Sequence, residues 1–271
     1  MASADQWTGK VAIVTGGSSG LGRSIAAALV DRGAHVAIAA RGAEKLELAA
    51  KELSARGGQV LAVPTDVTRQ ADVDALIART LERFGRLDIL VNNAGRSARG
   101  AAIETSPEEF AELMDLNLIA LVRCTRAAMP HLLASHGHLV NVGSLAGKTA
   151  ARYMGAYSAT KFAVSAYSQQ LRLELGPQGL HVLLVSPGPI ARDEPRRHLD
   201  EKLASLPESA RKPGAGVKVS LIKPDKLARL IVRACEKRAS ELVIPGRARV
   251  VFAINQLWPA LGDWIVRKMS S

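Results

Sequence analysis

Short apolar runs alternate with longer helical patterns through the first 190 residues, and this alternation constrains the fold more than any other feature of the sequence. Runs such as 10–15 (KVAIVT) and 35–40 (HVAIAA) are apolar at successive positions, which is typical of strands buried on both faces. Strands that alternate with helices predict an α/β fold, a doubly wound parallel sheet of about seven strands. The expected strands span 10–15, 35–40, 59–63, 87–91, 137–143, 180–186 and 241–245, and the expected helices 20–32, 43–55, 69–84, 106–133, 157–175 and 224–238.

One expected helix has a clear start signal. Ser106 is the expected N-cap, Pro107 is the first helical residue, and Glu109 completes a capping box. The pattern then predicts one helix to about residue 133, disturbed at Pro130.

The domain organisation follows from the absence of any linker rich in Ser, Gly or Pro before residue 190. We expect a single catalytic domain over 1–246, in which the charged, Pro-interrupted segment 191–223 serves as a mobile substrate lid. Residues 247–271 form an apolar C-terminal extension flanked by basic residues, and Pro259 breaks it into two short pieces.

Composition excludes several classes of protein. Apolar residues make up 48% and charged residues 23%, which excludes a disordered chain and a collagen-like fibre.

No window reaches 18 apolar residues and the start lacks a secretory pattern, so we expect a cytoplasmic protein. The two cysteines, Cys124 and Cys235, are expected to be buried thiols in a reducing compartment. No zinc spacing exists and the six histidines do not cluster near either cysteine in the sequence, so we expect no metal site.

The net charge of +11 is concentrated in residues 192–271. A basic C-terminal third is compatible with nucleic acid, an anionic membrane, an acidic substrate or simply a solvated surface. No nucleic-acid-binding motif is present, so nucleic acid is not an expected partner.

A glycine-rich turn follows the first expected strand, with Gly16, Gly20 and Gly22 before a helix. Such a turn lets a pyrophosphate approach the backbone, where the helix N-terminus supplies N–H groups and partial positive charge. The spacing differs from the G-x-G-x-x-G fingerprint, and alone the turn is weak evidence.

Polar residues follow other expected strands. Asn92–Gly95 follows the fourth and Ser144 follows the fifth, while Tyr157 and Lys161 share one helix face. A lysine one turn away favours the phenolate of a tyrosine, which would make it a better acid–base group near neutral pH. A tyrosine and a lysine at this spacing, taken by themselves, are also typical of a solvated helix face.

Taken together, these motifs resemble the short-chain dehydrogenase/reductase family, over about residues 10–245. The matching stretches are TGGSSGLG at 15–22, DVT at 66–68, DILVNNAG at 88–95, Asn117, Ser144, YSATK at 157–161, and Pro187-Gly188. The resemblance implies a Rossmann-like fold and an oxidoreductase that interconverts a carbonyl and a secondary alcohol by hydride transfer.

Four catalytic roles come with the resemblance. Tyr157 is implied as the general acid/base and Ser144 as the donor that positions the substrate oxygen. Lys161 is implied to lower the Tyr157 pKa and to bond the nicotinamide ribose. Asn117 is implied to hold a proton-relay water near Lys161.

The resemblance also implies the cofactor contacts. The expected residues are Gly16, Ser18, Ser19, Gly20, Leu21, Gly22, Arg41, Asp66, Val67, Asn93, Ala94, Gly95, Tyr157, Lys161, Pro187, Gly188 and Ile190. The acid that would bind the ribose 2′-OH of NAD is replaced by Ala40, and Arg41 follows it, which favours the 2′-phosphate of NADP(H) over NAD(H). Ser19 stands where some relatives have a second basic residue. Arg192 stands where many relatives have a Thr that bonds the carboxamide.

The substrate is less constrained. Expected walls are 96–97, 145–147, 152–154 and the 191–223 segment, whose apolar members favour an apolar or lipid-like carbonyl compound. The tail has three alternatives: packing on its own domain, packing on a second subunit, or peripheral contact with a membrane.

Similarity to the family implies a homodimer or homotetramer. The candidate interface residues are Leu113, Leu116, Leu121, Phe162, Tyr167 and Leu171. Alternative functions are a catalytically silent NADP(H)-binding sensor on the same fold, and an epimerase or dehydratase. The presence of Tyr157 and Lys161 argues against the first, and the compact length argues against the second.

Overall fold

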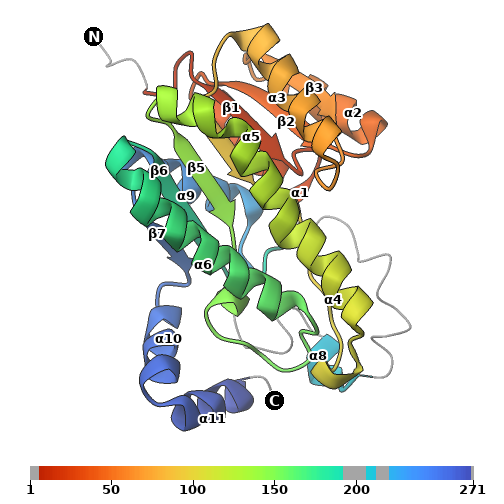
Figure 1. Ribbon diagram of the computed structural model, residues 1–271, viewed down its shortest axis with the longest axis vertical. Coiled ribbons are helices and arrows are strands. Elements are labelled where there is room, and N and C mark those ends of the chain that lie inside the picture. Colours follow the sequence, from red (N-terminus) through yellow and green to blue (C-terminus); the bar gives the residue numbers. More distant parts are fainter. Residues whose placement is uncertain (1–5, 192–205, 212–219, 270–271) are drawn as a thin grey trace.

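A computed structural model describes residues 6–191, 206–211 and 220–269 of the chain (Figure 1). It confirms a single seven-stranded, all-parallel sheet with the strand order β3-β2-β1-β4-β5-β6-β7. The strands are β1 (Val11–Thr15), β2 (His35–Ala40), β3 (Val60–Pro64), β4 (Ile89–Asn92), β5 (His138–Val142), β6 (His181–Pro187) and β7 (Glu241–Ile244). Each lies within one or two residues of an expected strand.

Helices cover both faces of this sheet (Figure 1). One face packs against α1 (Gly20–Val30), α2 (Ala43–Ser54) and α9 (Pro224–Glu236), and the other against α3 (Gln70–Phe84), α5 (Ala120–Ala134) and α6 (Tyr157–Leu175). Along β1, Ala12 and Val14 belong to the first core and Ile13 to the second, and all three are fully buried. Side chains that alternate between two apolar cores explain why the strands are apolar throughout.

The strand order reverses between β1 and β4. The chain therefore leaves the carboxyl ends of these two neighbouring strands in opposite directions, which opens a crevice at that edge of the sheet. The loops after β1, β4, β5 and β6 all reach this edge.

The expected long helix is three consecutive segments. The capping box at Ser106 is confirmed and begins α4 (Pro107–Met114). A π-helical turn, η2 (Asp115–Ile119), then leads into α5, so the irregularity lies at η2 and not at Pro130 as expected. Pro130 lies on the exposed side of α5, where water can bond the carbonyl that the proline leaves unpaired.

The C-terminal tail is a helical hairpin, α10 (Ala248–Leu257) and α11 (Pro259–Met269), broken at Pro259 as expected. Gly262 permits the close crossing, because a Cβ there would lie 2.5 Å from the Asn255 Cα. Large apolar side chains stay exposed on the hairpin: Val250, Leu257, Trp258, Leu261 and Trp264. Within the described residues, no helix combines the length and apolar character needed to cross a membrane.

Four short elements complete the described chain. They are η1 (Ala102–Glu104), η3 (Leu145–Gly147), η4 (Gly176–Gln178) and α8 (Glu208–Arg211). Most of the 191–223 segment, including Arg192, lies outside the described residues, so its role as a lid stays a prediction.

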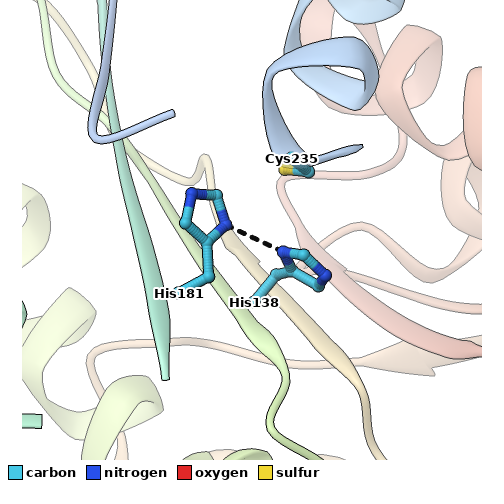
Figure 2. A group of neighbouring side chains, drawn as sticks. All are labelled: His138, His181 and Cys235. Carbon is cyan, nitrogen blue, oxygen red and sulfur yellow. Dashed lines mark hydrogen bonds between the residues drawn. The ribbon is translucent and has the colours of Figure 1, made fainter. Parts of the chain in front are cut away.

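Both cysteines are buried and free, as expected. The histidines do not cluster near either cysteine in the sequence, but two of them lie beside Cys235 in three dimensions. The parallel register pairs His138 at the start of β5 with His181 at the start of β6, and Cys235 near the end of α9 lies beside them (Figure 2). Sequence spacing missed the group because its members are 43 and 54 residues apart along the chain.

Candidate active site

A cavity of about 1630 Å³ opens at the carboxyl edge of the sheet. Its described lining includes the turn after β1, the loop after β4, residues that follow β5, the start of α6 and the loop after β6. Of the residues predicted for catalysis or cofactor binding, it brings together Gly16, Ser18, Ser19, Gly20, Leu21, Asn93, Ala94, Gly95, Ser144, Tyr157, Lys161, Pro187, Gly188 and Ile190.

The glycine turn forms a cradle beside the N-terminus of α1. Gly16 and Gly20 have φ angles of 67° and 51°, in the left-handed region that favours glycine. A Cβ at Gly22 would lie 2.2 Å from the Gly16 carbonyl oxygen, so only glycine lets α1 start this close to the turn. Ser19, the N-cap of α1, makes no side-chain capping bond. The first N–H groups of this 11-residue helix therefore fit the phosphates of a dinucleotide.

A threonine missed in the sequence analysis ties two loops together. The Thr15 hydroxyl accepts from the backbone N–H groups of Asn93 and Ala94, at 3.0 Å each, and donates to the Val91 carbonyl at 3.2 Å. The Asn93 side-chain amide donates back to the Thr15 carbonyl at 2.9 Å. These bonds fix the position of the NNAG motif against the glycine turn.

Tyr157 is the first residue of α6 and Lys161 lies one turn later, and both line the cavity. The Lys161 ammonium donates to the Val142 carbonyl at 2.8 Å and lies 5.9 Å from the centre of the Tyr157 ring. Burial lowers the pKa of Lys161 from 10.5 to about 8. Gly147 lets the backbone of the loop after β5 lie close to Lys161, since a Cβ on Gly147 would lie 2.4 Å from the Lys161 carbonyl oxygen.

Ser144 follows β5 and starts η3. Its hydroxyl oxygen accepts from the Ala146 backbone N–H at 3.1 Å, which leaves the hydroxyl hydrogen available to donate into the cavity. Ser144 therefore has the geometry of a donor to a substrate oxygen.

Asn117 lies behind the cavity wall and does not line it. It is 1% exposed, its amide oxygen accepts from the Arg96 N–H at 2.9 Å, and its amide nitrogen donates to the Arg96 carbonyl and to Thr160. The side chain is committed to holding the loop after β4 against α6, so its placement fits a positioning role.

Four more predicted cofactor residues do not line the described cavity: Gly22, Arg41, Asp66 and Val67. Val67 is buried in the core. Arg41 is exposed at the end of β2. The Asp66 carboxylate accepts from the Thr68 hydroxyl at 2.7 Å, which is the main cause of its lowered pKa, and the Arg41 charge adds to it.

Among the cationic residues of the lining that were not predicted for the site are Arg23 and Lys45. Arg23, on the first turn of α1, pairs with Glu52 at 3.1 Å, and Lys45 lies on the first turn of α2. Arg23 and Lys45 could have been predicted from their positions in the sequence, because both follow strands whose carboxyl ends reach the site.

The walls expected for the substrate are only part of the observed lining. Arg96, Ser97, Leu145, Ala146 and Met154 line the cavity, and so do Ala191, Arg211 and Leu221. Gly147, Arg152 and Tyr153 do not. The tail was expected to be an extension outside the catalytic domain, yet its hairpin lines the cavity through Ala248, Val250, Val251, Phe252, Val266 and Met269.

A phosphate cradle, a tyrosine–lysine pair and a serine on one cavity of a doubly wound sheet define a dinucleotide-dependent oxidoreductase. The sequence model of the short chain dehydrogenase family matches residues 10–202, and the chain belongs to this family. It is an NAD(P)-dependent short-chain dehydrogenase/reductase.

The glycine betaine reductase ATRR of Emericella nidulans is 37% identical over 228 residues. That match covers 84% of this chain but 18% of the much longer relative.

Solved structures show the same fold. The L-sorbose reductase of Gluconobacter frateurii, in complex with NADPH and L-sorbose, is 29% identical with a TM-score of 0.76, over 89% of this chain and 97% of that one. The 3-ketoacyl-(acyl-carrier-protein) reductase of Brucella melitensis, in complex with NADH, is 30% identical with a TM-score of 0.76, over 90% and 100% of the two chains.

Proposed function

We propose that this enzyme interconverts a carbonyl and a secondary alcohol with NADP(H), and that Tyr157 moves the proton. One observation carries the proposal: Tyr157, Ser144 and the buried Lys161 line the same cavity as the glycine cradle. A catalytically silent sensor would not need this set, so the enzyme is the better supported alternative.

Each residue has a defined task. The bound nicotinamide would supply or accept the hydride. Tyr157 donates a proton to the carbonyl oxygen in reduction and removes it in oxidation. Ser144 donates a hydrogen bond to the same oxygen, which stabilises the negative charge that develops there. The Lys161 cation, held on the Val142 carbonyl, favours the phenolate of Tyr157.

The preference for NADP(H) is supported by charge. No acid stands at the end of β2, and Arg41 follows it directly. Lys45 and Arg23 also line the cavity, Arg23 as the ion-pair partner of Glu52. A 2′-phosphate bound beside these groups gains charge-assisted bonds that a 2′-hydroxyl lacks.

We propose an apolar or lipid-like substrate. Beyond the residues assigned to the cofactor, the lining of the cavity includes several large apolar side chains: Met154, Leu221, Val251, Phe252, Val266 and Met269. Such a wall favours a ketone or alcohol with an apolar body. A screen of matched polar and apolar carbonyl compounds, followed by NADPH absorbance, tests the function. Turnover restricted to polar sugars would contradict the proposed substrate class, and the absence of turnover on all of them would contradict the reaction.

We also propose a homodimer or homotetramer formed through the α4–α5 and α6 faces. Leu113, Leu121 and Leu171 of the expected interface are buried within the chain. Of the remaining three, Leu116 and Tyr167 are partly buried, and Phe162, 39% exposed, is the better candidate contact. Ile119 at 39% and Leu173 at 68% extend the exposed apolar surface of the same region. Light scattering at micromolar concentration should give a multiple of 28.7 kDa, and a monomer would contradict this assignment.

A further inference from the structure

Three side chains of types that can ligate a metal lie together at the opposite edge of the sheet from the candidate active site. His138 and His181 are the first residues of β5 and β6, and Cys235 is the penultimate residue of α9. The two imidazoles lie on neighbouring strands, with the Cys235 side chain beside them (Figure 2). One nitrogen of each histidine and the cysteine sulfur all lie within 4.8 Å of one another. The proposed reaction uses none of these residues.

The hydrogen bonds fix which nitrogen of each ring carries a proton. The Nε2 of His181 is 2.8 Å from the Ala239 carbonyl oxygen, which can only accept, so Nε2 is the donor. The Nδ1 of His181 is then a free lone pair, and His138 Nδ1 donates to it at 2.8 Å. An imidazole held by a backbone carbonyl on one nitrogen, with its other lone pair aimed into a cluster, has the arrangement of a metal ligand.

We propose that Nδ1 of His138, Nδ1 of His181 and Sγ of Cys235 bind one thiophilic d¹⁰ cation, Zn²⁺ or Cu⁺. Two imidazoles and a thiolate suit these ions, which accept three protein ligands with or without a further water. Metal–nitrogen bonds of about 2.0–2.1 Å and metal–sulfur bonds of about 2.3 Å require the donor atoms to move by about 1 Å or less. The proton on Nδ1 of His138 must move to Nε2 when the metal binds.

The protonation states suit a metal at neutral pH. Burial lowers the pKa of His138 to about 3, and the charges of Arg238 and Lys10 add to this effect while Asp88 opposes it. Burial also lowers the pKa of His181, which favours the neutral imidazole that can bind a metal. Burial raises the pKa of the Cys235 thiol to about 12. A bound cation must therefore displace one proton from the thiol.

The charged neighbours are themselves paired. Lys10 contacts Asp88 at 3.3 Å, and Arg238 donates to the Gly179 carbonyl at 2.6 Å. Arg86 also pairs with Asp88, and Arg32 pairs with Glu236. These pairs reduce the repulsion that the surrounding cations would exert on a bound metal.

A second cavity is lined by two of the three side chains of the group, His138 and Cys235. This cavity, of about 210 Å³, is also lined by Lys10, Asp88 and Glu236, together with Trp7. The Trp7 ring packs against the His138 ring at 5.2 Å between centres, and its Nε1 donates to Glu236 at 3.0 Å. The cavity is large enough to admit a hydrated ion and to leave one water as a further ligand.

The test is metal binding by the full-length, tag-free protein after treatment with a chelator. Zn²⁺ is titrated by calorimetry, and Cu⁺ is titrated anaerobically in competition with a chromophoric chelator. We expect one ion per chain, with a Kd of about 1 µM or tighter for at least one of the two metals. Cys235→Ser should weaken binding by more than about 100-fold. Cys124→Ser is the matched control, because Cys124 is equally buried in α5 and should not affect binding.

Two further readouts separate this site from adventitious binding by surface histidines. Co²⁺ as a spectroscopic substitute should show a thiolate-to-cobalt charge-transfer band that Cys235→Ser removes. Calorimetry of Zn²⁺ in buffers of different ionisation enthalpy should report about one proton released per ion. If Cys235→Ser does not fold, as judged by circular dichroism and NADPH binding, His138→Gln serves as the second variant. The proposal is overturned if no ion binds stoichiometrically, or if the folded variant binds as tightly as the parent.

Discussion

Replacing Lys161 with methionine should make the protein more stable while it removes the proposed activity. Lys161 is 7% exposed, and burial lowers its pKa from 10.5 to about 8. At about 1.36 kcal/mol for each pH unit, keeping this group charged at pH 7 costs roughly 3 kcal/mol of folding stability. Its bond to the Val142 carbonyl returns about 1 kcal/mol. A methionine of similar length should therefore stabilise the fold by about 2 kcal/mol.

The pH dependence of this difference has a definite sign. Because the folded pKa of Lys161 lies below the unfolded value, the unfolded chain binds more protons between pH 8 and 10.5. The stability contributed by this site in the parent therefore rises with pH across that window. The advantage of Lys161→Met should be largest below pH 8 and should disappear as the pH approaches 10.5.

Urea unfolding at several pH values, without added cofactor, measures this effect. Lys148→Met is the matched control, because the Lys148 side chain is 30% exposed and pairs with Glu241 at 2.9 Å. We expect the control to lose up to about 1 kcal/mol, with no such pH trend. If Lys161→Met is no more stable than the parent at pH 7, the idea that the site stores an unfavourable buried charge is wrong.

Three other predictions concern the cradle, the cofactor and the tail. Gly22→Ala should lower the free energy of unfolding by about 1–3 kcal/mol in urea and weaken NADPH binding, because the added Cβ would overlap the Gly16 carbonyl. Gly42→Ala is the control and should change little, because its Cβ would have nothing within 4 Å. Equal effects of the two substitutions would contradict the cradle. Arg41→Ala should weaken NADPH by roughly 10–150-fold and NADH far less in fluorescence titrations, and equal losses would show that Arg41 does not read the phosphate. Removal of residues 250–271 should abolish any salt-sensitive sedimentation of the protein with anionic vesicles, because the exposed Trp258 and its apolar neighbours would insert into them. If the full-length chain does not bind the vesicles at low salt, internal or intersubunit packing of the tail is favoured instead.

Most of the fold could be predicted from the sequence because each strand is a short apolar run with its own boundaries. The start of α6 at Tyr157 was predicted to the residue, since the tyrosine and lysine must share one face. The π-helical turn at Asp115–Ile119 could not be predicted, because no proline or glycine marks it. Within this turn Asn117 is bonded to the Arg96 backbone, a tertiary contact that the local sequence does not reveal.

The candidate site was predicted less completely than the fold. Motifs identified the residues of the glycine turn and of the loops after β4 and β6 that line the cavity, because glycine and proline requirements leave a trace in the sequence. Lys45 and Thr15 were missed, since a lysine on an exposed helix and a threonine in a strand are unremarkable until the loops are assembled. The tail hairpin was missed as a cavity wall because its apolar residues carry no signal of what they face. Predicting that His138, His181 and Cys235 lie together would have required the register of β5 and β6.

The central claim is that Tyr157 is the proton donor of a carbonyl–alcohol oxidoreductase, and Tyr157→Phe tests it most directly. The substitution removes one hydroxyl and keeps the ring that faces Lys161 and the cavity. Turnover of a carbonyl compound that the parent reduces should fall by about 10²–10⁴-fold, the typical contribution of a general acid. NADPH affinity, measured by fluorescence titration, should stay within about threefold of the parent. A variant that binds NADPH normally and keeps more than about a tenth of the parent's turnover would contradict the account.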